Sequence, residues 1–172
     1  MELLADEVGD HATVVRFLVY TGLRWGAIAA LRVESLDMLR RRVNIRQAVA
    51  EVGGKLVWST PKSHERRSVP FPVFLAEPLA ALMVGKQRGD LVFGSAEGAV
   101  LRVSTWRPRV LNVAVKRVQE RTPAFPTVTP HDLPHTAASL SISAGANVKA
   151  VQTMLGHASA VAHPRHLRRP VP

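Results

Sequence analysis

The stretch TPHDLPHT at residues 129–136, together with LGHAS at residues 155–159, decides how the rest of the sequence is interpreted. Apolar residues between the two motifs recur at helical spacing, which predicts two short helices separated by a turn. Asp132 or the residue before it is suited to cap the first of these helices. His131 is therefore predicted at a helix start and His157 just beyond a helix end. Without further features, both would be ordinary surface histidines on a helical hairpin.

Composition limits the class of protein. The chain has 172 residues, of which 47% are apolar, enough for one core and too many for a disordered chain. Its formal net charge of +10 favours nucleic acid as partner over an anionic membrane, because no basic amphipathic helix with bulky anchors is evident. Cysteine is absent, which excludes disulfides and fits a reducing cytoplasm. Neither a membrane span nor a signal peptide is visible. We therefore expect a cytoplasmic domain.

The secondary-structure pattern is mainly helical. Helical periodicity covers four further segments: residues 8–20, 25–31, 73–85 and 104–115. A period of two marks three extended runs: residues 42–47, 55–58 and 66–70. These runs predict a small three-stranded antiparallel meander, and the whole pattern predicts a mainly helical α+β domain over residues 1–160. Residues 161–172 are rich in proline and arginine and are expected to form an irregular, exposed tail.

Four features occur in a fixed order: TGLRWG at residues 21–26, Lys62 in a predicted turn, His131 before a helix, and His157 after Leu-Gly. In this order and spacing, the sequence from Val8 to Ser159 resembles the catalytic domain of the tyrosine recombinase (phage integrase) family. The resemblance implies double-stranded DNA and other recombinase protomers as partners, with no membrane. It also implies site-specific recombination, in which a tyrosine cuts a DNA strand, forms a 3′-phosphotyrosyl link and rejoins the strand without metal or nucleotide cofactor.

The chemistry of strand cleavage explains the residue types of this family. Negative charge builds on the non-bridging phosphate oxygens in the transition state, and preorganised cations must meet it. Arginine suits this task because its planar fork donates two hydrogen bonds to a phosphate and keeps its charge. The resemblance assigns Arg24 to this clamp and Lys62 to the general acid at the leaving 5′-oxygen. It assigns His131 to proton transfer and His157 to a hydrogen bond with the scissile phosphate.

Other basic residues are candidates for contacts with the DNA backbone. Arg66 and Arg67 lie beside the predicted turn of Lys62, and Lys116 follows the helix predicted from Ser104. Such contacts hold a protein on DNA without reading its sequence. Solvated surface charge is the alternative interpretation of these side chains.

A metal site is a second interpretation of the histidines. His131 and His135 stand four residues apart and could share a cation on one helix face. No glutamate follows His131 as in a zincin helix, and the spacing places no further carboxylate ligand. We therefore expect neither a metal nor another cofactor.

Three departures from the family pattern bear on activity. Ala27 stands where an acidic residue usually follows the first arginine, and Pro134 stands where the family has its second phosphate-clamping arginine. Proline in a first helical turn costs the fold little, but losing one such donor typically costs about a hundred- to a thousand-fold in rate. The nucleophilic tyrosine of the family falls near His166 or Leu167, whereas the only tyrosine here is Tyr20, expected in or near the core. We therefore expect DNA binding with little or no catalysis.

The C-terminal tail has a possible origin in a frameshift within the gene of a decaying prophage integrase. With permissible codons read one base later, residues 164–172 become Leu-Asp-Thr-Tyr-Ala-Asp-Leu-Phe, the kind of segment that integrases carry around the nucleophile. We hypothesise a frameshift, which the nucleotide sequence of the gene tests. Family members usually have a separate helical DNA-clamping domain, and few residues precede Val8. A catalytic domain without that clamp is expected to bind DNA weakly, with steep salt dependence.

Two other functions stay open at this stage. One is a non-catalytic DNA-binding or regulatory remnant, which would occupy DNA or a full-length integrase. The other is a basic helical RNA-binding domain, although the aromatic content is only 5% and no stacking aromatics stand at suitable positions. The recombinase interpretation makes a spatial prediction: Arg24, Lys62, His131 and His157 should surround a pocket for one backbone phosphate.

Overall fold

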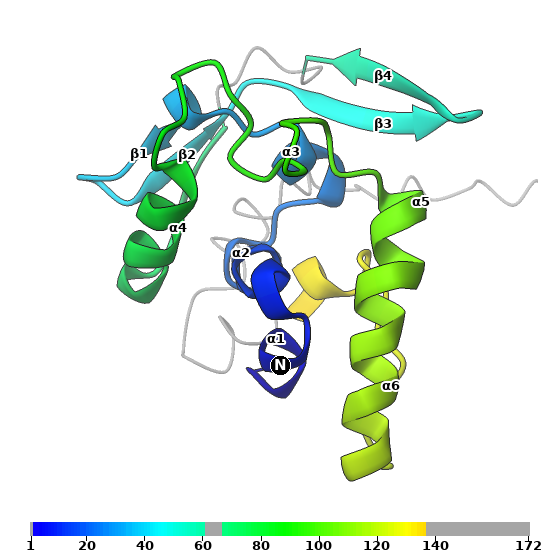
Figure 1. The fold of residues 1–172 in the computed structure, drawn as a ribbon. Helices are drawn as coiled ribbons and strands as arrows, with labels where there is room; N and C mark the ends of the chain where they lie inside the picture. Colours follow the sequence, from blue (N-terminus) through cyan, green and yellow to red (C-terminus); the bar gives the residue numbers. More distant parts are fainter. Residues whose placement is uncertain (1, 61–66, 137–172) are drawn as a thin grey trace, which may run out of the picture.

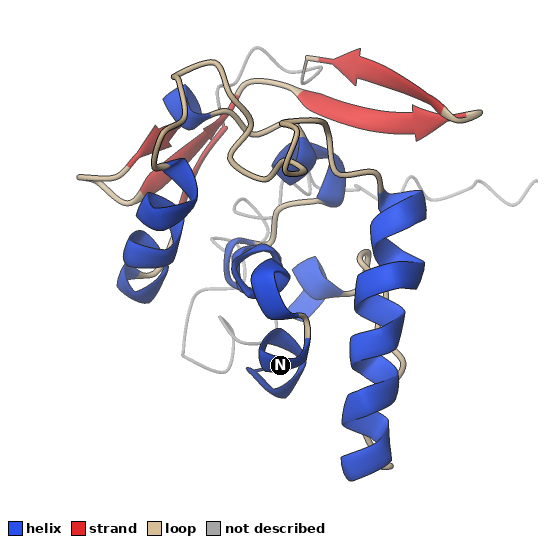
Figure 2. Cartoon of the chain, in the orientation of Figure 1, coloured by secondary structure: helices blue, strands red, loops and turns tan. Residues whose placement is uncertain are grey.

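The computed structural model describes residues 2–60 and 67–136. The second predicted helix and the tail of residues 161–172 therefore lie outside the described residues. The structure combines helices with two small antiparallel sheets, which lie at the top of the view in Figures 1 and 2 with most of the helices below them. The predicted mainly helical α+β class is confirmed. Within the described residues, no helix is both long and apolar enough to cross a membrane.

The N-terminal region forms three helices: α1 (Glu2–Glu7), α2 (Ala12–Thr21) and α3 (Trp25–Ala29). The helix predicted at residues 8–20 begins later, because Gly9 takes a left-handed φ of 57° and opens a 3₁₀ turn (Gly9–His11) before α2. The first helix was not predicted. Its six residues are too few for a periodic pattern, although Leu4 and Ala5 are fully buried.

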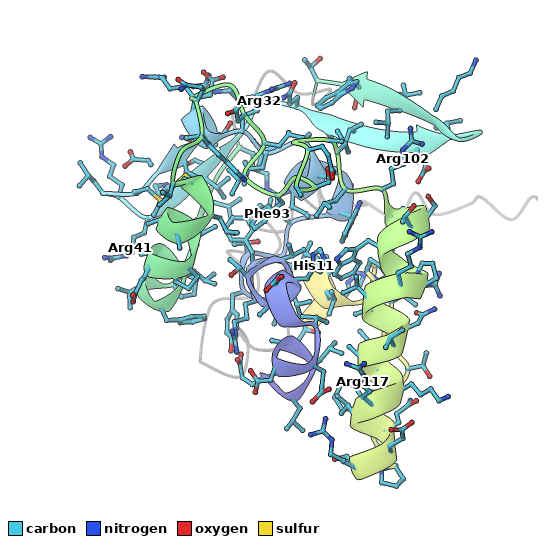
Figure 3. The ribbon with its side chains drawn as sticks, in the orientation of Figure 1. His11, Arg32, Arg41, Phe93, Arg102 and Arg117 are labelled. Atoms are coloured by element: carbon cyan, nitrogen blue, oxygen red, sulfur yellow. The ribbon has the colours of Figure 1, made fainter. Side chains whose placement is uncertain are left out.

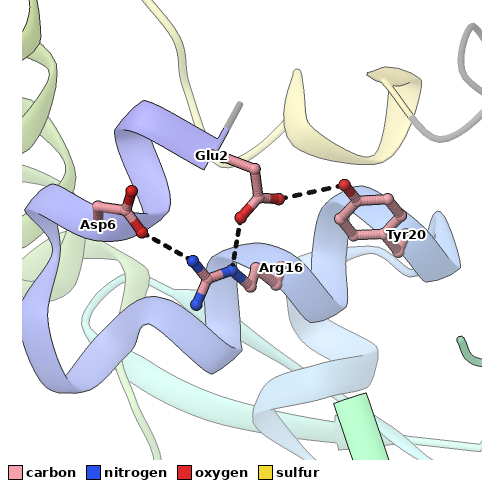
Figure 4. A network of polar contacts seen from close by, with 4 residues as sticks. All are labelled: Glu2, Asp6, Arg16 and Tyr20. Carbon is pink, nitrogen blue, oxygen red and sulfur yellow. Dashed lines mark hydrogen bonds and ion pairs between the residues drawn. The ribbon is translucent and has the colours of Figure 1, made fainter. Parts of the chain in front are cut away.

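A polar network on one side of α1 and α2 joins the two helices (Figure 4). Arg16 donates to Glu2 and to Asp6, each at 2.8 Å, and the hydroxyl of Tyr20 donates to Glu2 at 3.1 Å. The Tyr20 ring is half-buried and meets Phe74 edge-on, with ring centroids 4.9 Å apart. The prediction that Tyr20 lies in or near the core is confirmed.

The strands form two sheets instead of one meander. The three-stranded sheet has the order β1 (Leu36–Asp37), β2 (Arg42–Ile45), β5 (Arg67–Pro70), and the second sheet is the hairpin of β3 (Ala48–Val52) and β4 (Lys55–Ser59). The predicted pairing of the last extended run with the middle one is therefore wrong, because β5 pairs with β2.

Burial explains this pairing. Val43 of β2 and Val69 of β5 are paired in register and are 0% and 1% exposed, so the two strands share one face against the core. Most of β4 is exposed, and Val57 and Trp58 keep 50% and 42% of their surface. A third strand beside β4 would gain little apolar burial, whereas the edge of β2 offers a buried row.

The C-terminal half of the described chain supplies the remaining helices. A 3₁₀ turn (Val73–Leu75) leads into α4 (Ala76–Met83), which covers most of the predicted segment of residues 73–85. The helix predicted from Ser104 is longer than expected. It runs as one rod through α5 (Val103–Trp106), a π-helical turn η4 (Arg107–Leu111) and α6 (Asn112–Arg121) (Figure 1).

The core lies between the N-terminal helices, the three-stranded sheet and this rod. Phe17 of α2 is fully buried, and its ring centroid is 6.2 Å from that of Phe71 and 5.4 Å from that of Phe93. Phe93 points inward, whereas Arg41 and Arg117 lie at the periphery (Figure 3). The short segment at Leu91 bridges to Arg32, which ties the region after α4 to the end of α3.

Candidate functional site

Arg24 is presented by the tight turn between α2 and α3. Gly22 ends α2 in the left-handed region, with φ 65°, and its N–H donates to the carbonyl of Leu18 at 3.1 Å. Arg24 then takes an extended backbone and precedes the first turn of α3, where its carbonyl accepts from Ala27 at 2.9 Å. The Arg24 side chain is exposed and makes no hydrogen bond or ion pair within the described residues. Its guanidinium is therefore available to a ligand.

The residues after Arg24 hold α3 in place. A Cβ on Gly26 would lie 2.6 Å from the carbonyl oxygen of Val49, so α3 approaches β3 more closely than any other residue type allows. On the other side, the rings of Trp25 and Trp106 are stacked at a tilt of 41°, with centroids 4.6 Å apart. The TGLRWG motif thus fixes the helix start between the hairpin and the long rod.

His131 is presented by a second tight turn. The carboxylate of Asp132 accepts from the N–H of Thr129 at 2.8 Å and from its hydroxyl at 2.6 Å. The hydroxyl of Thr129 lowers the pKa of Asp132, since this hydrogen bond favours the charged carboxylate. Helix follows from residue 133, and the carbonyl of Asp132 accepts from the N–H of His135 at 3.1 Å. Asp132 therefore stands at the predicted helix start, but its carboxylate closes the preceding turn.

The two turns face one cavity of about 310 Å³. Its lining contains basic, apolar and hydroxyl side chains and no acidic ones: Gly22, Arg24, Trp25, Val103, Arg107, Thr129, Pro130, His131, Pro134 and His135. The structure therefore brings Arg24 and His131 together, as the sequence predicts, although they are far apart in the chain. Pro134 also lines the cavity, so the position of the family's second arginine faces the site without a donor.

Arg67 adds a second unneutralised charge near Arg24. Its Nε and Nη2 atoms are buried and have no hydrogen-bond partner within the described residues. Burial and the positive charge of Arg24 lower the pKa of the Arg67 guanidinium. Arg42 on the neighbouring strand contrasts with it, because Arg42 donates to the hydroxyl and the carbonyl of Ser68 at 2.8 and 2.9 Å. A bound anion would accept hydrogen bonds from the Nε and Nη2 atoms of Arg67 and compensate its charge.

Of the other predicted site residues, only Arg67 and Lys116 belong to the described residues, and neither lines this cavity. Lys62, Arg66 and His157 lie outside the described residues. Lys116 is exposed on α6 and does not line the cavity. Their predicted roles stay predictions.

One lining residue was missed by the sequence interpretation. Arg107 begins the π-helical turn and lines the same cavity as Arg24. Its position in the sequence carries no motif, and an arginine on a helix is usually solvated. A signal would have been its place directly after Trp106, had the contact of Trp106 with Trp25 been foreseen.

Two histidines of the cavity lie next to each other. The rings of His131 and His135 meet edge-on, with centroids 5.5 Å apart and an interplanar angle of 72°. Among residues 2–60 and 67–136, no group of three or more histidine, cysteine or acidic side chains is arranged to hold a metal ion. The donor chemistry of the cavity, arginine beside histidine, suits an anion better than a cation.

Relatives of this chain are recombinases. Tyrosine recombinase XerC of Mycobacterium bovis is 28% identical over 148 residues, covering 85% of this chain and 45% of the relative. Tyrosine recombinase XerD of Vibrio cholerae is 28% identical over 159 residues, covering 88% of this chain and 46% of the relative. The chain thus spans about half the length of the curated relatives that it matches.

A solved structure supports the same fold. The Tn1549 transposon integrase, in complex with transposon right end DNA, superposes with a TM-score of 0.79 at 22% identity, over 91% of this chain and 55% of that chain. A sequence model of the phage integrase family matches residues 5–163, which is nearly the whole chain. The resemblance inferred from the motifs is confirmed, and the chain belongs to the phage integrase family.

Proposed function

We propose that this chain binds duplex DNA through its backbone and holds one phosphodiester in the cavity between Arg24 and His131. The observation that carries the proposal is the shared cavity itself: two residues from distant parts of the sequence meet there, and no acidic side chain joins them. A volume of about 310 Å³ is at the small end of the range for ligand pockets, about 300–1,000 Å³. It suits one phosphate better than a nucleoside.

Each residue has a role that follows from its chemistry. Arg24 donates a pair of hydrogen bonds to the non-bridging oxygens, a role supported by its exposure and its position in the cavity lining. His131 exchanges a proton with the attacking or leaving oxygen. Lys62 and His157 are proposed to complete the site as general acid and phosphate donor. Arg66, Arg67 and Lys116 are proposed to touch the backbone beside it.

The inherited reaction is strand cleavage and rejoining in site-specific recombination, but we propose that this chain does not perform it. Its one tyrosine, Tyr20, does not line the cavity, and its hydroxyl donates to Glu2. Burial and the negative charge of Glu2 raise the pKa of Tyr20, which opposes formation of a phenolate. Without a nucleophile the chain holds DNA without a covalent link. Other recombinase protomers on the same DNA are the proposed protein partners.

A salt titration with a short DNA duplex tests the proposal. We expect Arg24→Gln to weaken binding roughly tenfold or more and to reduce the salt slope by about one, since one phosphate contact is lost. Arg88→Gln is the matched control, because Arg88 is also exposed but does not line the cavity. Equal effects of the two substitutions would refute the site.

Two further comparisons address the remaining functions. A nicked suicide substrate, analysed on a denaturing gel, is expected to give no covalent adduct. An adduct would refute the proposed loss of catalysis. Structured RNA is expected to bind more weakly than duplex DNA at equal salt. The reverse order would favour the RNA-binding alternative.

A further inference from the structure

We propose that Arg107 takes over the phosphate contact that Pro134 cannot make. This inference rests on the proposed function, since it needs a phosphate in the cavity. Arg107 and Pro134 both line that cavity together with Arg24, although they come from different elements. Pro134 is buried and has no side-chain donor. Arg107 offers the planar fork that the position of Pro134 lacks.

An aromatic pair connects the segment of Arg107 to the segment of Arg24. Trp25 directly follows Arg24, and Trp106 directly precedes Arg107. The centroids of these two rings are 4.6 Å apart, and Trp106 is only 3% exposed. Aromatic pairs with centroids about 4.5–7 Å apart are stabilised beyond the area they bury. The two arginines are therefore the chain neighbours of one aromatic pair, and both line the cavity.

The helix is widened where Arg107 stands. The N–H of Asn112 donates to the carbonyl of Arg107, five residues earlier, which defines a π-helical turn. Pro108 lies at the start of this turn and lacks the N–H that a regular α-helix would need there. Such single π turns occur frequently at functional sites. Here the turn begins with the side chain that lines the cavity.

The guanidinium of Arg107 has no ion-pair or hydrogen-bond partner in the described part of the chain. Arg102, at the start of the rod, donates to Glu51 at 3.0 Å, and Arg121, at its far end, is paired with Glu7. Arg107 is exposed and makes no hydrogen bond or ion pair within residues 2–60 and 67–136. A cation that lines an acid-free cavity without a protein partner is suited to bind an anion.

The first test compares phosphate binding by single-site variants. Inorganic phosphate is titrated into the full chain, and binding is followed by the NMR signals of the His131 and His135 rings, which line the cavity. We expect Arg107→Gln to weaken binding roughly tenfold, comparable to Arg24→Gln, with Arg107→Lys intermediate. Arg109→Gln is the matched control, because Arg109 is exposed on the same turn but does not line this cavity.

The second test asks whether an arginine at residue 134 makes Arg107 dispensable. We expect Pro134→Arg, added to Arg107→Gln, to restore phosphate and duplex binding to within a few-fold of the unsubstituted chain. Circular dichroism checks that each variant is folded. A folded double variant that stays weak would show that Arg107 does not replace the missing arginine.

The outcomes separate this inference from the proposed function. If Arg24→Gln weakens phosphate binding but Arg107→Gln behaves like Arg109→Gln, the inference fails and the phosphate site stands. If neither Arg24→Gln nor Arg107→Gln changes binding, the site and the inference fail together.

Discussion

At the scale of single residues, Arg67 carries a charge that nothing in the described structure neutralises. Its Nε and Nη2 atoms are buried without partners, and its pKa is lowered by burial and by Arg24. A buried charge without a partner costs free energy, because water and hydrogen-bonding groups are both missing. Locally unfavourable features of this kind cluster at binding and active sites.

Replacing Arg67 by methionine is therefore expected to stabilise the fold. Arg67→Met removes the uncompensated charge and keeps most of the volume, which should raise the free energy of unfolding by about 1 kcal/mol. Arg42→Met is the matched control on the paired strand. It loses both hydrogen bonds to Ser68 and should cost about 1–3 kcal/mol. Urea denaturation measures both.

Added phosphate should affect the stability of the unsubstituted chain and of Arg67→Met differently. An anion that binds beside Arg67 stabilises only the folded chain, so phosphate should raise the melting temperature of the unsubstituted chain more than that of Arg67→Met. If Arg67→Met is destabilised as strongly as Arg42→Met, the Arg67 guanidinium has a partner in the fold and its charge is compensated.

At the scale of elements, the contact between α3 and β3 positions Arg24. The space for a Cβ on Gly26 is occupied by the carbonyl oxygen of Val49, which belongs to rigid backbone. Either the helix or the hairpin must move if a side chain is added. The arginine that precedes α3 would move with it.

Gly26→Ala is expected to destabilise the chain by about 1–3 kcal/mol and to weaken phosphate binding. Gly89→Ala is the control, because Gly89 has an ordinary φ and open space around its Cβ position. It should leave stability unchanged or raise it by up to about 1 kcal/mol. Thermal denaturation of both variants provides the measurement. A neutral Gly26→Ala would mean that α3 is not held by this contact.

Local signals explain which elements could be predicted. Arg24 and His131 stand beside Gly22 and Asp132, residues whose backbone preferences mark helix boundaries in any context. The pairing of β5 was not predictable in this way. It depends on which neighbour offers a buried row, and that is known only once the core is assembled.

The role of Arg107 could not be predicted from local sequence signals either. Its functional signal is a contact between Trp25 and Trp106, which are distant in sequence, and nothing local distinguishes it from Arg109. The resemblance to a family also directs attention to positions that match its motifs. A residue on another element that replaces a missing motif residue does not stand at a motif position. Only the shared cavity reveals it.

At the scale of the whole molecule, α1 closes the end opposite the hairpin. It packs between α2 and α6 (Figure 1), with Leu4 fully buried and Glu7 paired with Arg121. Burial raises the pKa of Glu2, but hydrogen bonds from Arg16 and Tyr20 outweigh it and lower the pKa below its ordinary value. The Glu2 carboxylate therefore stabilises the docked helix while it is charged.

The stabilisation by Glu2 should depend on pH. Because its pKa is lowered on folding, the contribution is complete above the ordinary carboxyl range and is lost as the pH falls through the lowered value. Glu2→Gln should lower stability at pH 7 by less than about 1 kcal/mol, since the Glu2 carboxylate is largely exposed, and the difference should be smaller at pH 3, below the ordinary carboxyl range. Denaturation at both pH values measures this difference.

Amide hydrogen exchange locates the effect of this substitution. Glu2→Gln should speed exchange in α1 at neutral pH. Glu97→Gln should not, because the carboxylate of Glu97 accepts a hydrogen bond from the hydroxyl of Ser95 in its own loop. Equal protection of α1 in all three proteins would show that the network in Figure 4 does not hold the helix.

The stacked tryptophans give the cavity an optical reporter of its own. The sequence has three tryptophans. Trp25 lines the cavity, and Trp106 is buried against the ring of Trp25. Trp58 lies on the exposed hairpin of β3 and β4. Emission from Trp25 and Trp106 responds to an anion that binds in the cavity, and a quencher dissolved in the buffer reaches Trp58 first. Occupancy can therefore be followed by intrinsic fluorescence in unlabelled protein.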